Sequence, residues 1–146
     1  MYILDTDHVT LYQQGYAALG QRIAGLSPEE LGTTVITYEE QLQGRLAVVR
    51  RARTVPERVT AYYWLRRTLD FFCRFPVIPF VEGAAKAFQH LKDLKLRIGT
   101  QDLLIAAIAL SRQTTVVTRN QRDFGRIPDL LIDDWSLSTD FPTANP

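Results

Sequence analysis

Four acidic residues are the side chains of this sequence whose types and spacing could do chemistry together: Asp5, Glu40, Asp102 and Asp123. Carboxylates that gather at one place repel each other, and one would take up a proton unless a cation neutralised the group. An all-oxygen site suits Mg²⁺ or Mn²⁺ rather than zinc. The usual chemistry of such a site is phosphoryl transfer or phosphodiester cleavage, in which the ions activate water and stabilise the leaving oxygen.

Each acid, taken alone, also has a purely structural explanation. Asp5 could cap a first helix, and Thr37 with Glu40 matches a capping-box pattern. Asp102 would lie in the first turn of a helix, where the helix dipole stabilises an acid, and Asp123 could be a turn residue. These explanations account for the acids one by one, but they leave their shared placement unexplained.

The elements that must position the acids can be predicted from short apolar, mostly β-branched segments that alternate with helical patterns. The predicted strands are 2–4, 33–37, 77–81, 114–118 and 130–132. The predicted helices are 8–24, 38–51, 56–74, 82–95 and 101–112, with a short one after residue 120. This alternation indicates an α/β domain with a parallel sheet. Ligands of such sheets bind beyond the carboxyl ends of the strands, so the acids should converge at that edge.

The bulk composition indicates one globular domain over 1–137, with a mobile tail at 138–146. The chain has 146 residues, of which 46% are hydrophobic and 23% charged, and its net charge of +1 favours neither nucleic acid nor a membrane. No apolar run reaches the ~18 residues of a membrane span, and no signal peptide is visible, so we expect a cytoplasmic protein. The single cysteine, Cys73, excludes an internal disulfide framework and a Cys-rich zinc site, and we expect it to be buried.

The stretch 45–74 has a composition of its own, with eight arginines beside only two acids, Glu57 and Asp70. Apolar residues alternate with the arginines, which predicts two amphipathic helices with a basic face and an apolar face. The basic face is either merely solvated or an approach surface for a polyanion. Tyr62, Tyr63 and Trp64 cannot all face one core, because adjacent helical residues point ~100° apart. At least one of them should be partly exposed.

Four segments, in order, resemble the motifs of PIN-domain proteins, and the closest subgroup is the VapC-type toxin of bacterial toxin–antitoxin pairs. The segments are YILDTDHV, TTVITYEEQLQGRL, IGTQDLLIAAIAL and TTVVTRNQRDFGRIPDLLIDDW. The resemblance selects Glu40 rather than Glu39 as the acid of the second motif. It implies a PIN-like doubly wound, three-layer α/β/α fold with a parallel sheet of about five strands. It also implies a Mg²⁺- or Mn²⁺-dependent ribonuclease, a homodimer and a small VapB-like antitoxin that covers the active-site groove.

The resemblance also implies roles for single residues. Asp5, Glu40 and Asp102 would bind metal directly or through water, and Asp123 would supply the fourth charge, since Asn120 stands where many PIN domains have an acid. The residues expected to orient the acids or waters are Thr6, Thr37, Thr118 and Asn120. The residues expected to meet RNA or the antitoxin are Arg50, Arg51, Arg53, Tyr62, Tyr63 and Trp64.

Two other functions fit parts of the sequence. In a haloacid-dehalogenase-like phosphatase, Asp5 would be the nucleophile, Asp7 the acid/base, and Asp133 with Asp134 the metal pair. That hypothesis leaves the acids at 40 and 102 without a role. A non-enzymatic partner-binding module is the other alternative, and the intact set of acids argues against it. We assign His8, which follows the first two acids, a capping or surface role.

Overall fold

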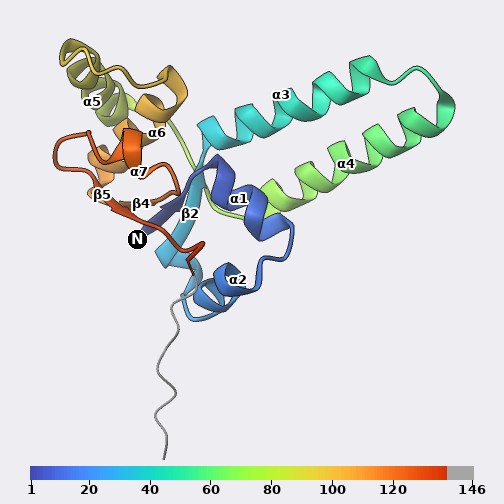
Figure 1. Ribbon diagram of the computed structural model, residues 1–146, viewed down its shortest axis with the longest axis horizontal. Helices are drawn as coiled ribbons and strands as arrows, with labels where there is room; N and C mark the ends of the chain where they lie inside the picture. The colour runs from blue at the N-terminus through green and yellow to red at the C-terminus, as the bar shows by residue number, and fades with distance from the viewer. Residues whose placement is uncertain (138–146) are drawn as a thin grey trace, which may run out of the picture.

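A computed structural model describes residues 1–137 and shows one five-stranded, all-parallel sheet in the order β3-β2-β1-β4-β5 (Figure 1). The strands are β1 (Tyr2–Leu4), β2 (Leu31–Thr34), β3 (Val77–Ile78), β4 (Thr115–Val117) and β5 (Leu131–Asp133). The predicted doubly wound parallel sheet of about five strands is therefore confirmed. The predicted tail at 138–146 lies outside the described residues. None of the described helices is both long and apolar enough to cross a membrane.

The helices follow the predicted order with shifted ends. They are α1 (Thr6–Gln13), α2 (Ala17–Ala24), α3 (Val35–Arg51), α4 (Val55–Arg74), α5 (Glu82–Asp93), α6 (Thr100–Arg112) and α7 (Gln121–Phe124), with a 3₁₀ turn at Pro28–Glu30. The prediction of a single helix over 8–24 is wrong, because a turn separates α1 from α2. Gly15 adopts φ +76° there, a conformation that side chains with a Cβ rarely reach.

The second strand ends earlier than the sequence suggests, at Thr34 rather than Thr37. The Thr34 side chain caps α3 by accepting a hydrogen bond from the backbone N–H of Thr37. Three β-branched residues, Val35, Ile36 and Thr37, which favour a strand by propensity, therefore form the first turn of a helix. The capping box predicted from Thr37 and Glu40 is wrong, since the cap lies three residues earlier. This shift moves both residues onto α3, beside the strand end.

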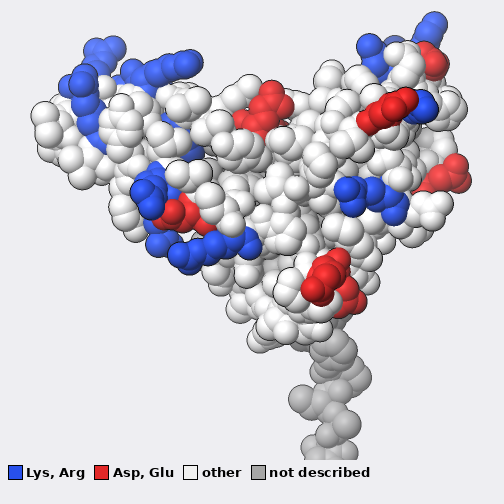
Figure 2. Space-filling view, turned by 180° about the vertical axis from the view of Figure 1, so that it is seen from behind, with Lys and Arg blue, Asp and Glu red and all other residues white. Residues whose placement is uncertain are grey.

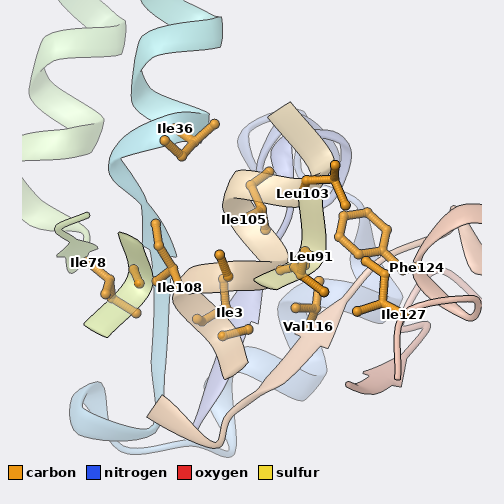
Figure 3. Close-up of a cluster of buried hydrophobic side chains, with 14 residues drawn as sticks. Ile3, Ile36, Ile78, Leu91, Leu103, Ile105, Ile108, Val116, Phe124 and Ile127 are labelled. Carbon is orange, nitrogen blue, oxygen red and sulfur yellow. The ribbon is translucent and has the colours of Figure 1, made fainter. Parts of the chain in front are cut away.

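The sheet is buried on both faces, which makes the three layers. Ile3 and Val116 point into a core shared with α5 and α6, whose buried side chains are shown in Figure 3. Their chain neighbours Leu4 and Val117 point to the other face, where α1, α2 and the end of α4 cover them. Successive residues of a strand face opposite sides, so helices on both faces favour central strands with few charged or strongly polar residues on either side.

Ile108 offers a test of the core under α6, because its side chain is completely buried. Ile108→Ala should lower the free energy of unfolding by about 2–5 kcal/mol, since it removes apolar contacts and leaves a cavity. Urea unfolding followed by circular dichroism would measure this change. Val59→Ala is the control, because Val59 is 65% exposed and its truncation should change the free energy by less than ~0.5 kcal/mol. Equal effects of the two substitutions would contradict this description of the core.

Helices α3 and α4 form a hairpin that projects from the rest of the fold (Figure 1). The apolar face of this hairpin is not a buried core stripe, because Val55, Val59 and Leu69 are all exposed. Of the 20 residues of α4, only Ala61 and Thr68 are buried. Cys73 is also exposed, contrary to expectation. An exposed apolar surface of this kind is typical of a site where another macromolecule docks.

Candidate active site

The site begins where β1 passes into α1. Asp5 follows the last residue of β1, and its backbone N–H donates to the carbonyl of Val117 on the neighbouring strand, at 3.1 Å. Its side chain caps α1 by accepting from the backbone N–H of His8, at 2.8 Å. Asp5 is only 6% exposed. The parallel pairing of β1 and β4 therefore brings Asp5 beside Thr118, the buried residue that follows β4.

The second acid reaches the same place from α3. The hydroxyl of Thr6 donates to Oε1 of Glu40 at 2.9 Å, and it lies 3.1 Å from the hydroxyl of Thr37. Thr6 directly follows Asp5, so these contacts fasten Glu40 to the start of α1. Glu39 is exposed and accepts from Gln43 on its own helix instead. The contacts agree with the choice of Glu40 over Glu39 as the acid that joins Asp5.

The third and fourth acids are joined by Asn120. Its amide Nδ2 donates to Oδ2 of Asp102 at 3.3 Å and to Oδ2 of Asp123 at 3.1 Å. Asn120 also caps α7, since its Oδ1 accepts from the backbone N–H of Asp123, and its own N–H donates to the hydroxyl of Thr118. Asp102 lies in the first turn of α6. An amide at position 120 thus bridges two carboxylates without adding a charge.

The four carboxylates share one electrostatic environment. The pKa of Asp102 is raised, first by burial and then by the negative charges of Glu40, Asp5 and Asp123, while the Asn120 hydrogen bond opposes the shift. Burial and like charges both disfavour an ionised carboxylate, and a cation would reverse their effect. The predicted site residues from four separate segments therefore lie at one edge of the sheet, beyond the ends of β1 and β4.

The donor set fits a hard, hydrated cation. The side chains are carboxylates, hydroxyls and one amide, which are oxygen ligands of the kind that Mg²⁺ and Mn²⁺ prefer. Over residues 1–137, no three His, Cys, Asp or Glu side chains lie close enough to chelate an ion directly. A metal here would keep several of its waters, as Mg²⁺ usually does, with the acids binding some of those waters.

The raised pKa of Asp102 predicts that the site destabilises the metal-free fold. A carboxyl whose pKa is higher in the folded state lowers stability progressively as pH rises from its unfolded pKa to its folded pKa; the loss is complete above the folded pKa and absent below the unfolded one. Asp102→Asn should therefore raise the melting temperature at about pH 7.5 in EDTA, with the gain shrinking toward about pH 3.5. Thermal unfolding by circular dichroism at both pH values checks this. A lower melting temperature at neutral pH would contradict it.

A comparison with known families agrees with this geometry. The family model of the PIN domain matches residues 4–130. The chain belongs to the PIN-domain family. Ribonuclease VapC1 of Haemophilus influenzae (strain R2866) is 28% identical over 144 residues, covering 93% of this chain and 98% of that protein. Ribonuclease VapC2 of Rickettsia felis is 44% identical over 46 residues, which cover 32% of this chain and 34% of that protein.

Solved structures share the whole PIN fold with this chain. VapBC-1 from nontypeable Haemophilus influenzae has a TM-score of 0.73 and 27% identity, covering 93% of this chain and 98% of that one. VapBC2 from Rickettsia felis, bound to a DNA fragment from its promoter, has a TM-score of 0.70 and 25% identity, covering 92% and 98%. The resemblance to PIN-domain proteins seen in the sequence motifs is thus confirmed.

Two of the acids required by the phosphatase hypothesis, Asp7 and Asp133, are engaged by other partners in this PIN domain. Asp7 forms an ion pair with Arg119, so it does not stand free as an acid/base beside Asp5. Asp133 accepts from the indole N–H of Trp135 and lies 3.5 Å from Arg22. The phosphatase hypothesis therefore gains no support from either the contacts or the family.

Sequence reasoning did not predict two polar contacts beside the site. His8 is completely buried against Asp5, so the capping or surface role assigned to it is wrong. Arg119 reaches Asp7 across 112 positions of sequence. The spacing of three residues between Asp5 and His8 was visible and places both on one turn, but no sequence pattern connects Arg119 with Asp7.

The residues predicted to meet RNA or an antitoxin all lie on the projecting hairpin. Arg50 and Arg51 end α3, and Arg53 lies in the turn before α4, all three exposed. The prediction of at least one exposed aromatic residue is confirmed, because Tyr62, Tyr63 and Trp64 are 56%, 54% and 45% exposed. The arginines lie at the tip of this arm, whereas Tyr62 lines a groove with Tyr38 and Leu42 nearer to Glu40.

Proposed function

We propose that this PIN-domain protein is a ribonuclease that hydrolyses RNA phosphodiester bonds with Mg²⁺ or Mn²⁺, and that it is the toxin of a toxin–antitoxin pair. The convergence of Asp5, Glu40, Asp102 and Asp123 carries the proposal. Hydrogen bonds from Thr6 and Asn120 hold three of these acids in place, and burial, followed by the charges of the other three acids, raises the pKa of Asp102. Relatives named ribonuclease VapC over nearly the full chain support it. A cytoplasmic location, where cellular RNA is found, is part of the same proposal.

The metal would be held by Asp5, Glu40, Asp102 and Asp123, directly or through water. When bound, it would supply an activated water and would stabilise the charge on the leaving oxygen. Thr6 and Thr37 would orient Glu40, since the Thr6 hydroxyl donates to that carboxylate and lies within hydrogen-bond distance of the Thr37 hydroxyl. A fixed carboxylate binds and orients a hydrated ion with less loss of conformational entropy.

Asn120 and Thr118 would orient the other two acids of the site, Asp102 and Asp123. The Asn120 amide holds Asp102 and Asp123 at once, and its own N–H is held by the Thr118 hydroxyl. These two residues would set the separation of the two carboxylates, whose like charges would otherwise drive them apart. The fourth negative charge then comes from Asp123, one helical turn after Asn120.

The hairpin would serve RNA and the antitoxin. Figure 2 shows Lys and Arg side chains gathered over the projecting arm and an acidic patch in the hollow between the arm and the rest of the fold. The arginine fork binds phosphate oxygens in pairs, and exposed aromatic rings stack on bases. Arg51 lies eleven positions after Glu40 on α3, or roughly 16 Å along the helix, so a bound strand would run from the tip toward the acids.

The same hairpin carries an apolar groove suited to a protein partner. The groove has a volume of about 320 Å³ and is lined mainly by Tyr38, Leu42, Tyr62, Leu65 and Leu69. An antitoxin with an apolar segment and acidic flanks could fill the groove and satisfy the nearby arginines. The similar structures named VapBC are complexes by their printed names, which supports a VapB-like partner. A homodimer of this chain completes the proposal, with exposed apolar residues of the hairpin available to both contacts.

The test is to incubate the purified protein with mixed cellular RNA in Mg²⁺, in Mn²⁺ or in EDTA, and to map the new RNA ends. Cleavage at defined sites with either metal, and none in EDTA, is the expected result. Metal-independent cleavage would refute the metal-bound site. Inertness under all three conditions would favour the partner-binding module, and covalent trapping of a phosphoryl analogue on Asp5 would favour the phosphatase.

A further inference from the structure

His8 is a buried polar residue to which the proposed reaction assigns no role. Its side chain is completely buried, and its Nδ1 lies 3.2 Å from Oδ1 of Asp5. Its backbone N–H donates to the same oxygen at 2.8 Å. Both contacts from His8 therefore fall on one oxygen of the carboxylate.

The other oxygen of Asp5 is left available. Among the contacts of the described residues, Oδ2 of Asp5 receives no hydrogen bond, whereas Oδ1 receives two from a single neighbour. A carboxylate held at one oxygen cannot rotate freely about its Cβ–Cγ bond. Oδ2 is then the atom that faces a ligand, and its direction is set by the residue that holds Oδ1.

The far side of the imidazole faces Asp134, the residue that follows β5. His8 Nε2 lies 3.4 Å from Oδ1 of Asp134, within ion-pairing distance, although it makes no hydrogen bond with residues of the described chain. Asp134 is itself fixed, because Oδ1 accepts from the backbone N–H and the hydroxyl of Ser136 at 2.9 and 2.6 Å. Its side chain is 16% exposed. The ring thus stands between two carboxylates that come from opposite ends of the sequence.

We propose that His8 is a positioning residue of the metal site, which clamps Oδ1 of Asp5 and braces it against Asp134 so that Oδ2 is presented to a divalent cation. The inference rests on the proposed metal-dependent function. Groups that orient a metal ligand through a hydrogen bond typically contribute ~10–100-fold in metal affinity. The contribution should come from the donor at Nδ1, not from the volume of the ring.

The experiment measures Mn²⁺ binding without RNA, by calorimetry and by electron paramagnetic resonance of free Mn²⁺. His8→Leu fills the space but removes both ring nitrogens, and it should weaken Mn²⁺ binding at least ~10-fold. His8→Asn keeps an amide donor near the position of Nδ1 and should stay within about threefold of wild type. Asp134→Asn removes the negative charge that faces Nε2 of His8, and it should weaken Mn²⁺ binding by a factor between those of the two His8 variants.

Several outcomes would overturn this role. One is an unchanged Mn²⁺ affinity in folded His8→Leu. Another is an equal loss of Mn²⁺ affinity in His8→Leu and His8→Asn, which would indicate that His8 acts only by packing. If His8→Leu does not fold, as circular dichroism would show, unchanged affinity in Asp134→Asn overturns it instead. Wild-type protein that binds Mn²⁺ but cuts no RNA would refute the proposed nuclease while leaving the role of His8 standing. Wild-type protein without Mn²⁺ binding would refute both.

Discussion

Asp102→Asn should reduce RNA cleavage by at least ~100-fold, because loss of a charged metal ligand removes several kcal/mol of transition-state stabilisation. The substitution keeps the volume of the side chain and can keep the contact with Asn120. Asp5→Asn should have an effect of the same size, since its carboxylate lies at the start of the same site. Initial rates on a mapped RNA substrate, at fixed Mg²⁺, give the measurement.

Asp129→Asn is the matched control for these substitutions. Asp129 is exposed and precedes β5, so it lies toward the opposite edge of the sheet from the site, and its replacement should leave the rate unchanged. The higher melting temperature expected for metal-free Asp102→Asn would exclude unfolding as the cause of lost cleavage. Cleavage at the wild-type rate by purified Asp102→Asn would refute the assignment of Asp102 to the reaction.

Replacement of Arg50, Arg51 and Arg53 by glutamine should weaken RNA binding on the order of 10-fold at low salt. Each arginine that contacts a phosphate releases counterions, so the slope of log affinity against log salt should become shallower by up to about three units. Antitoxin binding should weaken as well, because the three arginines lie on the same hairpin as the apolar groove, where an acidic segment of a bound antitoxin would pair with them. Fluorescence anisotropy with labelled RNA over a salt series, using catalytically inactive protein, measures the RNA affinity and its salt slope. The same method with labelled antitoxin measures the antitoxin affinity.

A charge-matched control separates this surface from a general effect of net charge. Arg97, Arg112 and Arg126 are exposed and lie outside the hairpin, so their joint replacement by glutamine removes the same charge from elsewhere. That variant should keep most of the salt dependence and all of the antitoxin affinity. If the hairpin variant shows an unchanged slope and unchanged antitoxin binding, its arginines are only solvated.

Local sequence patterns were enough to predict the sheet and the four acids. Buried parallel strands are mostly apolar and β-branched, and this pattern is visible in single segments such as 2–4 and 115–117. The acids could be collected because strand ends of a parallel sheet meet at one edge. The end of β2 could not be predicted, because β-branched residues favour a strand by propensity whereas Thr34 caps a helix there.

The sequence by itself determined the fold class and the family and selected the four acids of the candidate site, because each depends on the order and spacing of residues along a few short segments. Only the tertiary structure decided that His8 is buried against Asp5, that Arg119 pairs with Asp7, and that the apolar side of the hairpin is exposed. Contacts between residues more than a hundred positions apart depend on strand order and helix packing. Whether an amphipathic helix buries its apolar face depends on what packs beside it, and around α4 the described chain supplies too little to cover it.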